Sequence, residues 1–460
     1  MTFVHCDRHR PRRLIAGLAA LIAATGLTLG MAGSAQADQA DQAAQTPVDH
    51  ALAADTRFFV PPPADGSVQQ IGQLLRSGDR TDATLIAEME ATPAAVWLTG
   101  GTPDQVADQV RTTLFEARLE RAEPVFVLYD IPGRDCSQYS AGGALDTAAY
   151  EAWIDAVTKA VGTTHAVMLV EPDSLGDMPS DCNLPTSTYP YTNADRFTEI
   201  DYAVTALEND PDTSVYLDGT NSHWQQVGNI SSRLVQADVQ DTQGFFLNVS
   251  NYQTNAASQD YGSWISDCIA MITDTSDWAY NKPADCASQY YPASVNDFST
   301  WGLTTAWYAK NMGGAVATTH YVIDTSRNGQ GRNTMQGYAD APYDQPANVI
   351  TTLASGAWCN PPGAGLGLRP TADTGVPLLD AYLWAKTPGL SDGQCDAAGG
   401  VRAWDYAAYT EPGWPTDATA QNLFDPLWGL DDPAAGAWFP QQALQLAQNA
   451  NPPLTGIPLP

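Results

Sequence analysis

Basic residues are scarce in this 460-residue chain. Its 21 Lys and Arg residues stand against 52 Asp and Glu residues, which gives a formal net charge of −31 at pH 7. Because binding to phosphate groups requires clustered Lys and Arg side chains, this balance excludes nucleic acid and an anionic membrane surface as partners. A neutral polymer such as a polysaccharide is compatible with it, although acidity alone also favours the solubility of an extracellular protein.

Patterns for metal and nucleotide binding are also absent. The cysteines lack the paired C-x-x-C spacing that is typical of a structural zinc site. No Gly-x-Gly-x-x-Gly turn follows the first expected strand, which argues against a dinucleotide-binding fold. The sequence therefore predicts neither a metal nor a cofactor.

The N-terminus has the composition of an export signal. A group of arginines between Arg8 and Arg13 precedes an apolar stretch from Leu14 to Met31, and Ala35-Gln36-Ala37 is typical of a cleavage site. These features predict a signal peptide over residues 1–37 and a secreted, extracellular protein. A single membrane anchor is the alternative, which Gly and Thr within the apolar stretch disfavour. We expect no membrane contact after the signal is removed.

The rest of the chain has no internal linker or repeat. Residues 38–55 are expected to be a flexible leader, residues 56–452 a single folded domain, and residues 453–460 a loose tail. Of the seven cysteines, Cys6 lies in the removable segment. The others predict disulfides in an exported chain, with the pairing left open by the sequence: Cys136, Cys182, Cys268, Cys286, Cys359 and Cys395.

Strand-like apolar runs alternate with helix-like amphipathic segments along this domain. Strands are predicted at 95–98, 124–129, 165–170, 214–217, 244–249 and 319–323, and helices at 102–121, 146–161 and 194–208. This order predicts an α/β fold with parallel strands and helices outside them, and favours a β/α barrel over an open sheet.

Two of the predicted strands break into a Pro-containing turn that carries an aspartate. One is Val127-Leu-Tyr-Asp-Ile-Pro-Gly-Arg-Asp135-Cys, and the other is Val170-Glu-Pro-Asp173-Ser-Leu. The carboxyl ends of barrel strands share one face, where burial and neighbouring charge can shift the pKa of an acid into a catalytic range. Paired carboxylates of this kind are typical of glycoside hydrolysis.

The same segments resemble a known family. The run from Val127 to Cys136, continued by Ser140-Ala141-x-Gly143, resembles a signature of family 6 of the glycoside hydrolases, and the segment from Glu171 to Leu175 resembles a second one. Further segments agree in collinear order: Tyr216-Leu-Asp218, Asn248-Val-Ser-Asn251-Tyr252, Trp358-Cys359-Asn360, Leu383-Trp384-x-Lys386 and Ser391-Asp392-Gly393. The resemblance extends over roughly residues 56–452.

The resemblance implies a distorted, partly open, TIM-like β/α barrel of about seven strands with long active-site loops. It also implies a monomer that hydrolyses cellulose and β-1,4-glucan oligosaccharides with inversion of the anomeric centre. Among family members, some cleave internally in an open cleft and others release cellobiose from chain ends in a tunnel.

The family's catalytic residues map onto three aspartates here. The resemblance implies that Asp173 is the general acid, and that Asp135 raises its pKa and helps to activate water, with Ser140 as a relay. Asp392 matches the aspartate proposed as general base, and Asp218 matches an acid with a structural or electrostatic role.

Other matched positions imply sugar contacts and disulfides. Tyr129 matches a tyrosine that presses the sugar towards a distorted ring, and Asn248 is expected to bind hydroxyl groups. The positions matched to sugar-contacting side chains are Trp97, Trp224, Trp358 and Lys386. The implied disulfides are Cys136–Cys182 and Cys359–Cys395, which leave Cys268–Cys286 as the third. Where some relatives carry His and Glu, this chain has Asn221 and Leu390, a difference that concerns sugar contacts only.

Two further acids are expected to be structural, with Asp324 paired to Arg327 and Glu171 in a salt bridge.

Segments 255–298 and 396–436 are expected to be extra loops, and the second resembles an insertion of bacterial exo-acting members. The sequence thus predicts a cellobiohydrolase acting from the non-reducing end. The alternatives are an open-cleft endoglucanase and, from another class, a non-catalytic polysaccharide-binding protein.

Overall fold

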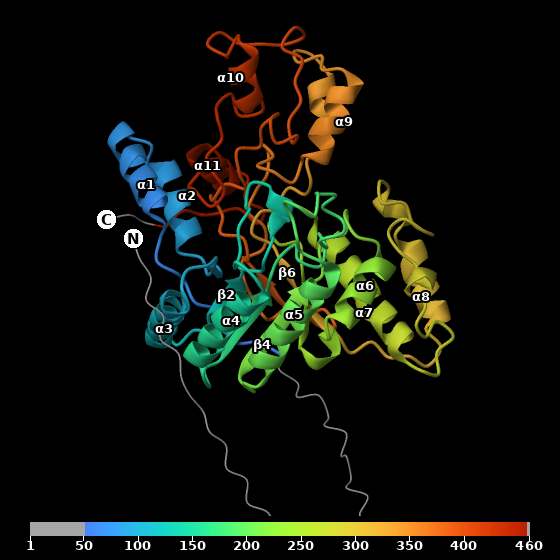
Figure 1. Ribbon diagram of the computed structural model, residues 1–460. Helices are drawn as coiled ribbons and strands as arrows, with labels where there is room; N and C mark the ends of the chain where they lie inside the picture. Colours follow the sequence, from blue (N-terminus) through green and yellow to red (C-terminus); the bar gives the residue numbers. More distant parts are fainter. Residues whose placement is uncertain (1–50, 458–460) are drawn as a thin grey trace, which may run out of the picture. The chain divides into compact units, whose positions relative to one another are not determined.

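Seven parallel strands form the centre of the computed structural model, which describes residues 51–457 (Figure 1). They are β1 (Val96–Leu98), β2 (Val125–Leu128), β3 (Ala166–Val170), β4 (Thr213–Asp218), β5 (Gly244–Leu247), β6 (His320–Asp324) and β7 (Leu379–Leu383). Each strand pairs in parallel with the next one in the chain. The strands curl into a half-barrel, so the expected partly open β/α barrel is confirmed.

The barrel is open between its first and last strands. In the described residues β1 and β7 share no ladder, but the Ala95 N–H donates to the Trp384 carbonyl at 2.9 Å beside them. The Trp97 indole N–H adds a bond of 2.8 Å to the Ala385 carbonyl. These two bonds hold the edge strands near each other without closing the sheet.

Helices follow most of the strands. They are α1 (Asp65–Ser77), α2 (Arg80–Glu90), α3 (Pro103–Glu120), α4 (Thr147–Val161), α5 (Asn193–Glu208), α6 (Val227–Gln236), α7 (Asn255–Thr273), α8 (Gly302–Asn311), α9 (Ala347–Ser355), α10 (Ala418–Leu423) and α11 (Pro440–Gln448). Two begin at a reciprocal cap, in which Thr102 pairs with Gln105 and Thr192 with Asp195. Such caps fix where the chain leaves each strand-end loop.

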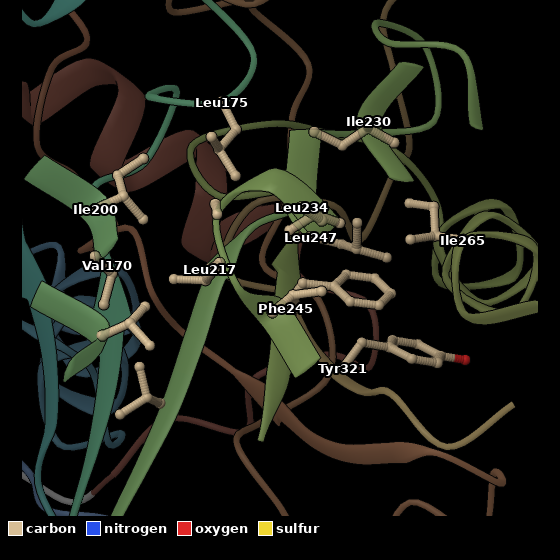
Figure 2. Close-up of a cluster of buried hydrophobic side chains, with 14 of the residues drawn as sticks. Val170, Leu175, Ile200, Leu217, Ile230, Leu234, Phe245, Leu247, Ile265 and Tyr321 are labelled. Atoms are coloured by element: carbon tan, nitrogen blue, oxygen red, sulfur yellow. The ribbon is translucent and has the colours of Figure 1, made fainter. Parts of the chain in front are cut away.

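The core has two layers because the strands are buried on both faces. Phe126, Leu128 and Val170 face the helices, whereas Val127 and Leu169 fill the barrel interior. Figure 2 shows the outer layer, where Leu217 and Phe245 of the sheet pack among apolar side chains of α5, α6 and α7. This double burial explains why the strands read as continuous apolar runs rather than alternating ones.

The predicted strands and helices are present in the structure, which also contains elements that were not predicted. These are the strand β7 and the helices α1, α2, α6, α8, α9, α10 and α11. Segment 255–298 is not a loop, because α7 occupies its first half, with one face buried by Tyr261, Trp264 and Ile265. The β7 strand contains Asp380, whose carboxylate contacts His320 at 2.6 Å, and this buried acid interrupts the apolar pattern.

The chain ends are only partly described. The predicted signal peptide at 1–37 and most of the predicted leader lie outside the described residues, although Leu52 packs against the inner core. Residues 453–456 are anchored rather than loose: Leu454 is buried, and the Glu88 carboxylate accepts the N–H groups of Thr455 and Gly456. Over residues 51–457, none of the helices is long and apolar enough to cross a membrane.

Candidate active site

A cavity of about 400 Å³ lies at the carboxyl ends of the strands. It is lined by nine of the predicted site residues: Trp97, Tyr129, Asp135, Ser140, Asp173, Trp224, Trp358, Lys386 and Asp392. They come from β1, from the loops that follow β2, β3, β4 and β7, and from the segment after α9. The fold thus brings together residues that are almost 300 positions apart, as the barrel geometry predicts.

Asp173 is a half-buried carboxyl group in the turn after β3. In the described part of the chain, neither a hydrogen bond nor an ion pair engages its side chain. Burial raises its pKa well above the ordinary value, and the nearby carboxylates of Asp218, Asp177 and Asp135 raise it further, while the Lys386 ammonium opposes them. Both effects favour the protonated form of Asp173, which is the form that can donate a proton.

Asp135 lies in the loop after β2, and its surroundings raise its pKa less than that of Asp173. Its carboxylate accepts the Ser140 backbone N–H at 2.5 Å. Burial raises the pKa of Asp135 to about 6, and the Ser140 bond and the Arg134 guanidinium limit the rise. Asp135 can therefore gain or lose a proton at mildly acidic pH. Ser140 contacts it through the backbone, so a relay through the Ser140 hydroxyl stays a prediction.

Arg134 fixes the Asp135 loop against the sheet. Its guanidinium donates to the carbonyls of Ser140, Thr99 and Tyr129. It also lies 4.6 Å from the centre of the Tyr129 ring, a cation–π contact. Tyr129 packs edge-on against Trp97 with ring centres 5.4 Å apart. The Asp135 loop, Arg134 and the Trp97–Tyr129 pair thus form one wall of the cavity.

Asp177 is a fourth carboxyl group that lines the cavity beside Asp135, Asp173 and Asp392, and it was not predicted from the sequence. Its backbone N–H donates to the Asp173 carbonyl at 2.7 Å, so it lies one helical turn further on. Burial raises its pKa to about 6; Asp135 and Asp181 add to the rise, and Arg196 and Arg233 oppose it. The spacing of four residues after Asp173 was the available signal, because such pairs share a face of a turn.

Replacing Asp177 with asparagine tests the effect of this carboxyl group on Asp173. The Asp177 charge raises the pKa of Asp173, so its removal lowers that pKa. Asp173 then loses its proton at lower pH, and we expect the alkaline limb of the pH–rate profile to move towards acid. The rate above neutrality should fall severalfold while the rate at acidic pH stays near that of the wild type. An unshifted alkaline limb would show that Asp177 does not act on the acid.

Asp392 is the most strongly coordinated carboxylate of the cavity. It contacts the Arg327 guanidinium at 2.8 Å and the Lys386 ammonium at 3.1 Å, and it accepts the Asn360 backbone N–H at 3.0 Å. Burial alone would raise the pKa of Asp392, but Arg327 and Lys386 outweigh it and hold the pKa below its ordinary value. Asp392 is therefore held in its ionised form at neutral pH, and its role as general base stays a prediction.

The expected pairing of Asp324 with Arg327 is wrong, because Arg327 bonds to Asp392 instead. The Asp324 carboxylate accepts backbone N–H groups, among them those of Ser326 and Lys386. Asp324 is nonetheless structural, since these bonds position the loop that carries Lys386.

Glu171 also lacks the salt bridge expected for it. Its buried carboxylate accepts the backbone N–H groups of Asp130 and Ile131 at 3.0 Å. Burial raises the pKa of Glu171 to about 7. Glu171 thus links β3 to the start of the Asp135 loop through hydrogen bonds rather than through a cation.

Two predicted site residues lie behind the cavity wall. Asp218 is buried and accepts the backbone N–H groups of Gly176 and Thr220, a contact that fits the structural role expected for it. Asn248 is fully buried, and its amide bonds to the backbone of Gln253 and Asp324. The expected contact of Asn248 with sugar hydroxyls is therefore wrong, because the amide is used inside the fold.

Left-handed backbone conformations gather at this end of the barrel. They include Asp135 (φ 57°), Glu171 (φ 53°), Asp173 (φ 68°) and Asn248 (φ 68°). Such conformations are unfavourable for residues other than glycine and cluster at functional sites. Of these residues, Asp135 and Asp173 line the cavity, whereas Glu171 and Asn248 bond to backbone groups inside the fold.

Three disulfides stabilise the surrounding loops. The structure pairs Cys136 with Cys182, Cys268 with Cys286 and Cys359 with Cys395, the same pairs that the resemblance implies. The first joins the loop of Asp135 to the segment that follows Asp173. Across the described residues, no group of three or more His, Cys, Asp or Glu side chains is arranged to hold a metal ion.

Comparison with known proteins identifies the family of the chain. The profile of the glycosyl hydrolases family 6 matches residues 53–450. Endoglucanase A of Cellulomonas fimi is 29% identical over 395 residues, which cover 85% of this chain and 61% of that protein. The 1,4-beta-D-glucan cellobiohydrolase C of Emericella nidulans is 27% identical over 416 residues, 86% of this chain and 77% of that protein.

A solved structure shares the fold. The endoglucanase Cel6 of Mycobacterium tuberculosis, in complex with a methyl-cellobiosyl-thio-cellobioside, is 30% identical and superposes with a TM-score of 0.56. The match covers 86% of this chain and 98% of that one. Since the family profile spans most of the chain, the protein belongs to family 6 of the glycosyl hydrolases.

Proposed function

We propose that this protein is a secreted, inverting β-1,4-glucanase that acts on cellulose and its oligosaccharides. One observation carries the proposal: among the described residues the Asp173 carboxyl group has no hydrogen-bond or ion-pair partner, and it lies in a cavity with Asp135 and Asp177, where burial and these neighbouring charges raise its pKa. A carboxyl group kept neutral near pH 7 is what protonation of a glycosidic oxygen requires.

In the proposed reaction, Asp173 donates its proton to the glycosidic oxygen as the bond from that oxygen to the anomeric carbon breaks. A water molecule forms the new bond to the same carbon from the opposite face and gives up a proton to a carboxylate. The resemblance assigns that proton to Asp392. We propose Asp135 instead, because a carboxylate with a pKa of about 6 is a better base than one whose pKa is lowered.

Asp392 contributes a fixed negative charge to the same reaction. Its carboxylate is bound to two cations and accepts the Asn360 N–H, so it stays ionised throughout. A fixed negative charge beside the anomeric carbon stabilises the positive charge that develops there. Trp97, Trp224 and Trp358 supply flat apolar surfaces on which sugar rings stack.

We further propose that the enzyme releases cellobiose from the non-reducing end of the chain. Support comes from the segment after β7, which is fastened to the cavity margin. Asp396 bonds to the Tyr139 hydroxyl at 2.9 Å, and the Trp428 indole donates to the Asn360 carbonyl at 2.7 Å. Relatives include both endoglucanases and cellobiohydrolases, so an open-cleft endoglucanase is the second candidate.

Product analysis on amorphous cellulose, with viscosity followed in parallel, tests both levels of the proposal. We expect cellobiose as the main early product with little loss of viscosity, because chain-end cleavage barely shortens the polymer. A steep early fall in viscosity would support the endoglucanase instead. The absence of soluble sugar, with retained binding to the polymer, would indicate a non-catalytic polysaccharide-binding protein.

A further inference from the structure

A turn between α7 and α8 presents two adjacent tyrosine rings to solvent. Tyr291 is 78% exposed and Tyr290 38% exposed, whereas most large side chains of the described residues are buried. Such exposed apolar rings carry an unfavourable hydration free energy, and on a rigid surface they often mark a binding site. The lining residues of the catalytic cavity do not include Tyr290 or Tyr291.

The turn is held rigidly from below. Its ends are joined by reciprocal backbone hydrogen bonds, Ser288 N–H to Tyr291 carbonyl at 2.7 Å and Tyr291 N–H to Ser288 carbonyl at 3.2 Å. The Thr304 hydroxyl donates to the Ser288 carbonyl at 2.8 Å, and the Cys268–Cys286 disulfide ties the preceding residues to α7. A ring on such a frame loses little conformational entropy when a ligand stacks on it.

The turn also lies against the wall of the catalytic cavity. The Tyr290 hydroxyl donates to the Trp224 carbonyl at 3.2 Å, and the buried Gln289 amide donates to the Gln225 carbonyl at 2.8 Å. Trp224 lines the cavity, and the charge of Arg332, another lining residue, acts on Tyr290. Tyr290 therefore adjoins the Trp224 side of the cavity, and Tyr291 follows it on the same turn.

We propose that the Tyr290–Tyr291 turn is an outer binding subsite for a β-1,4-glucan chain that extends beyond the catalytic cavity. The inference rests on the proposed function. A neutral sugar polymer fits because its C–H faces stack on tyrosine rings and because a chain of formal charge −31 would repel an acidic ligand. Tyr291 offers the stacking surface, and Tyr290 ties the turn to the Trp224 wall.

Substitution of Tyr291 tests the subsite. For Tyr291→Ala we expect kcat/KM on cellohexaose and on amorphous cellulose to fall ~3–10-fold, the loss of one aromatic stacking contact. The shortest oligosaccharide that is cleaved should be hydrolysed at the wild-type rate, because it does not reach the turn. Tyr291→Phe should behave as the wild type. Equal rates for Tyr291→Ala and the wild type at every length, or an equal loss at every length, would overturn the proposal.

A matched control is available on the same segment. Tyr280 is 40% exposed but lies outside the turn, so Tyr280→Ala should leave all rates unchanged. A length-dependent loss of rate in this variant as well would also overturn the proposal.

If the wild type cleaves no β-1,4-glucan, the proposed function fails, and calorimetric binding of cellohexaose then tests the subsite by itself. Weaker binding by Tyr291→Ala than by wild type and Tyr280→Ala supports it, and equal binding refutes it.

Discussion

Asp173→Asn is expected to lower kcat on cello-oligosaccharides by at least ~10²-fold, and up to ~10⁴-fold. The asparagine amide keeps the shape of the side chain but has no acidic proton to give to the glycosidic oxygen. Asparagine also tolerates the left-handed backbone of Asp173 (φ 68°), which alanine would adopt less readily. The loss can therefore be attributed to the missing proton rather than to a distorted turn.

The assignment can be checked with two substrates and a binding measurement. An aryl cellobioside with a good leaving group, such as dinitrophenolate, needs no protonation, so its hydrolysis should be far less affected by Asp173→Asn. Calorimetry should show oligosaccharide binding close to that of the wild type. A variant that hydrolyses cellotetraose at the wild-type rate, or that loses both substrates equally, would remove Asp173 from the role of general acid.

Asp392→Asn is expected to have the largest effect on stability. The substitution leaves Arg327 and Lys386 buried without their common counter-charge, and breaking a buried ion pair in this way costs about 3–5 kcal/mol of unfolding free energy. The pKa of Asp392 is lowered in the folded state, so its stabilising effect is present above the unfolded-state pKa. That effect should disappear as the pH falls through the folded-state pKa.

Urea unfolding of the wild type and Asp392→Asn at pH 7 and pH 3 measures the loss of unfolding free energy. The difference in unfolding free energy between the two proteins should be smaller at the lower pH.

The same variant separates the two candidate bases. If Asp135 accepts the proton of water, the acidic limb of the pH–rate profile near its pKa of about 6 persists in Asp392→Asn and is lost in Asp135→Asn. The reverse result would restore Asp392 as the base.

The barrel and the two strand-end aspartates could be predicted because their signals are local. Apolar runs that end in Asp135 and Asp173 define both a strand and a position on the active face. The helix α7 was predicted as a loop because polar residues such as Asn255 and Gln259 interrupt the apolar pattern of its buried face. Asn248 was misassigned for a related reason, since a strand-end amide can bond inwards as well as outwards.

The partners of the buried charges could not be predicted, because they depend on distant parts of the chain. Arg327 bonds to Asp392, 65 positions away, and no local pattern distinguishes it from the closer Asp324. The Tyr290 contact with Trp224 likewise joins residues 66 positions apart. Such pairs form only when the strands curl into the half-barrel and bring distant segments together. They can therefore be identified only once the fold is known.

The tie between the loops of Asp135 and Asp173 has a consequence for how the enzyme matures. Two links hold these loops together: the Cys136–Cys182 disulfide, and buried Arg196, which donates to the carbonyls of Pro132 and Ser174. Arg196 acts as soon as the chain folds, whereas the disulfide needs an oxidant. The spacing of Asp135 and Asp173 therefore depends in part on the oxidation of Cys136 and Cys182, so we expect it to be fully fixed only in a compartment that supplies an oxidant.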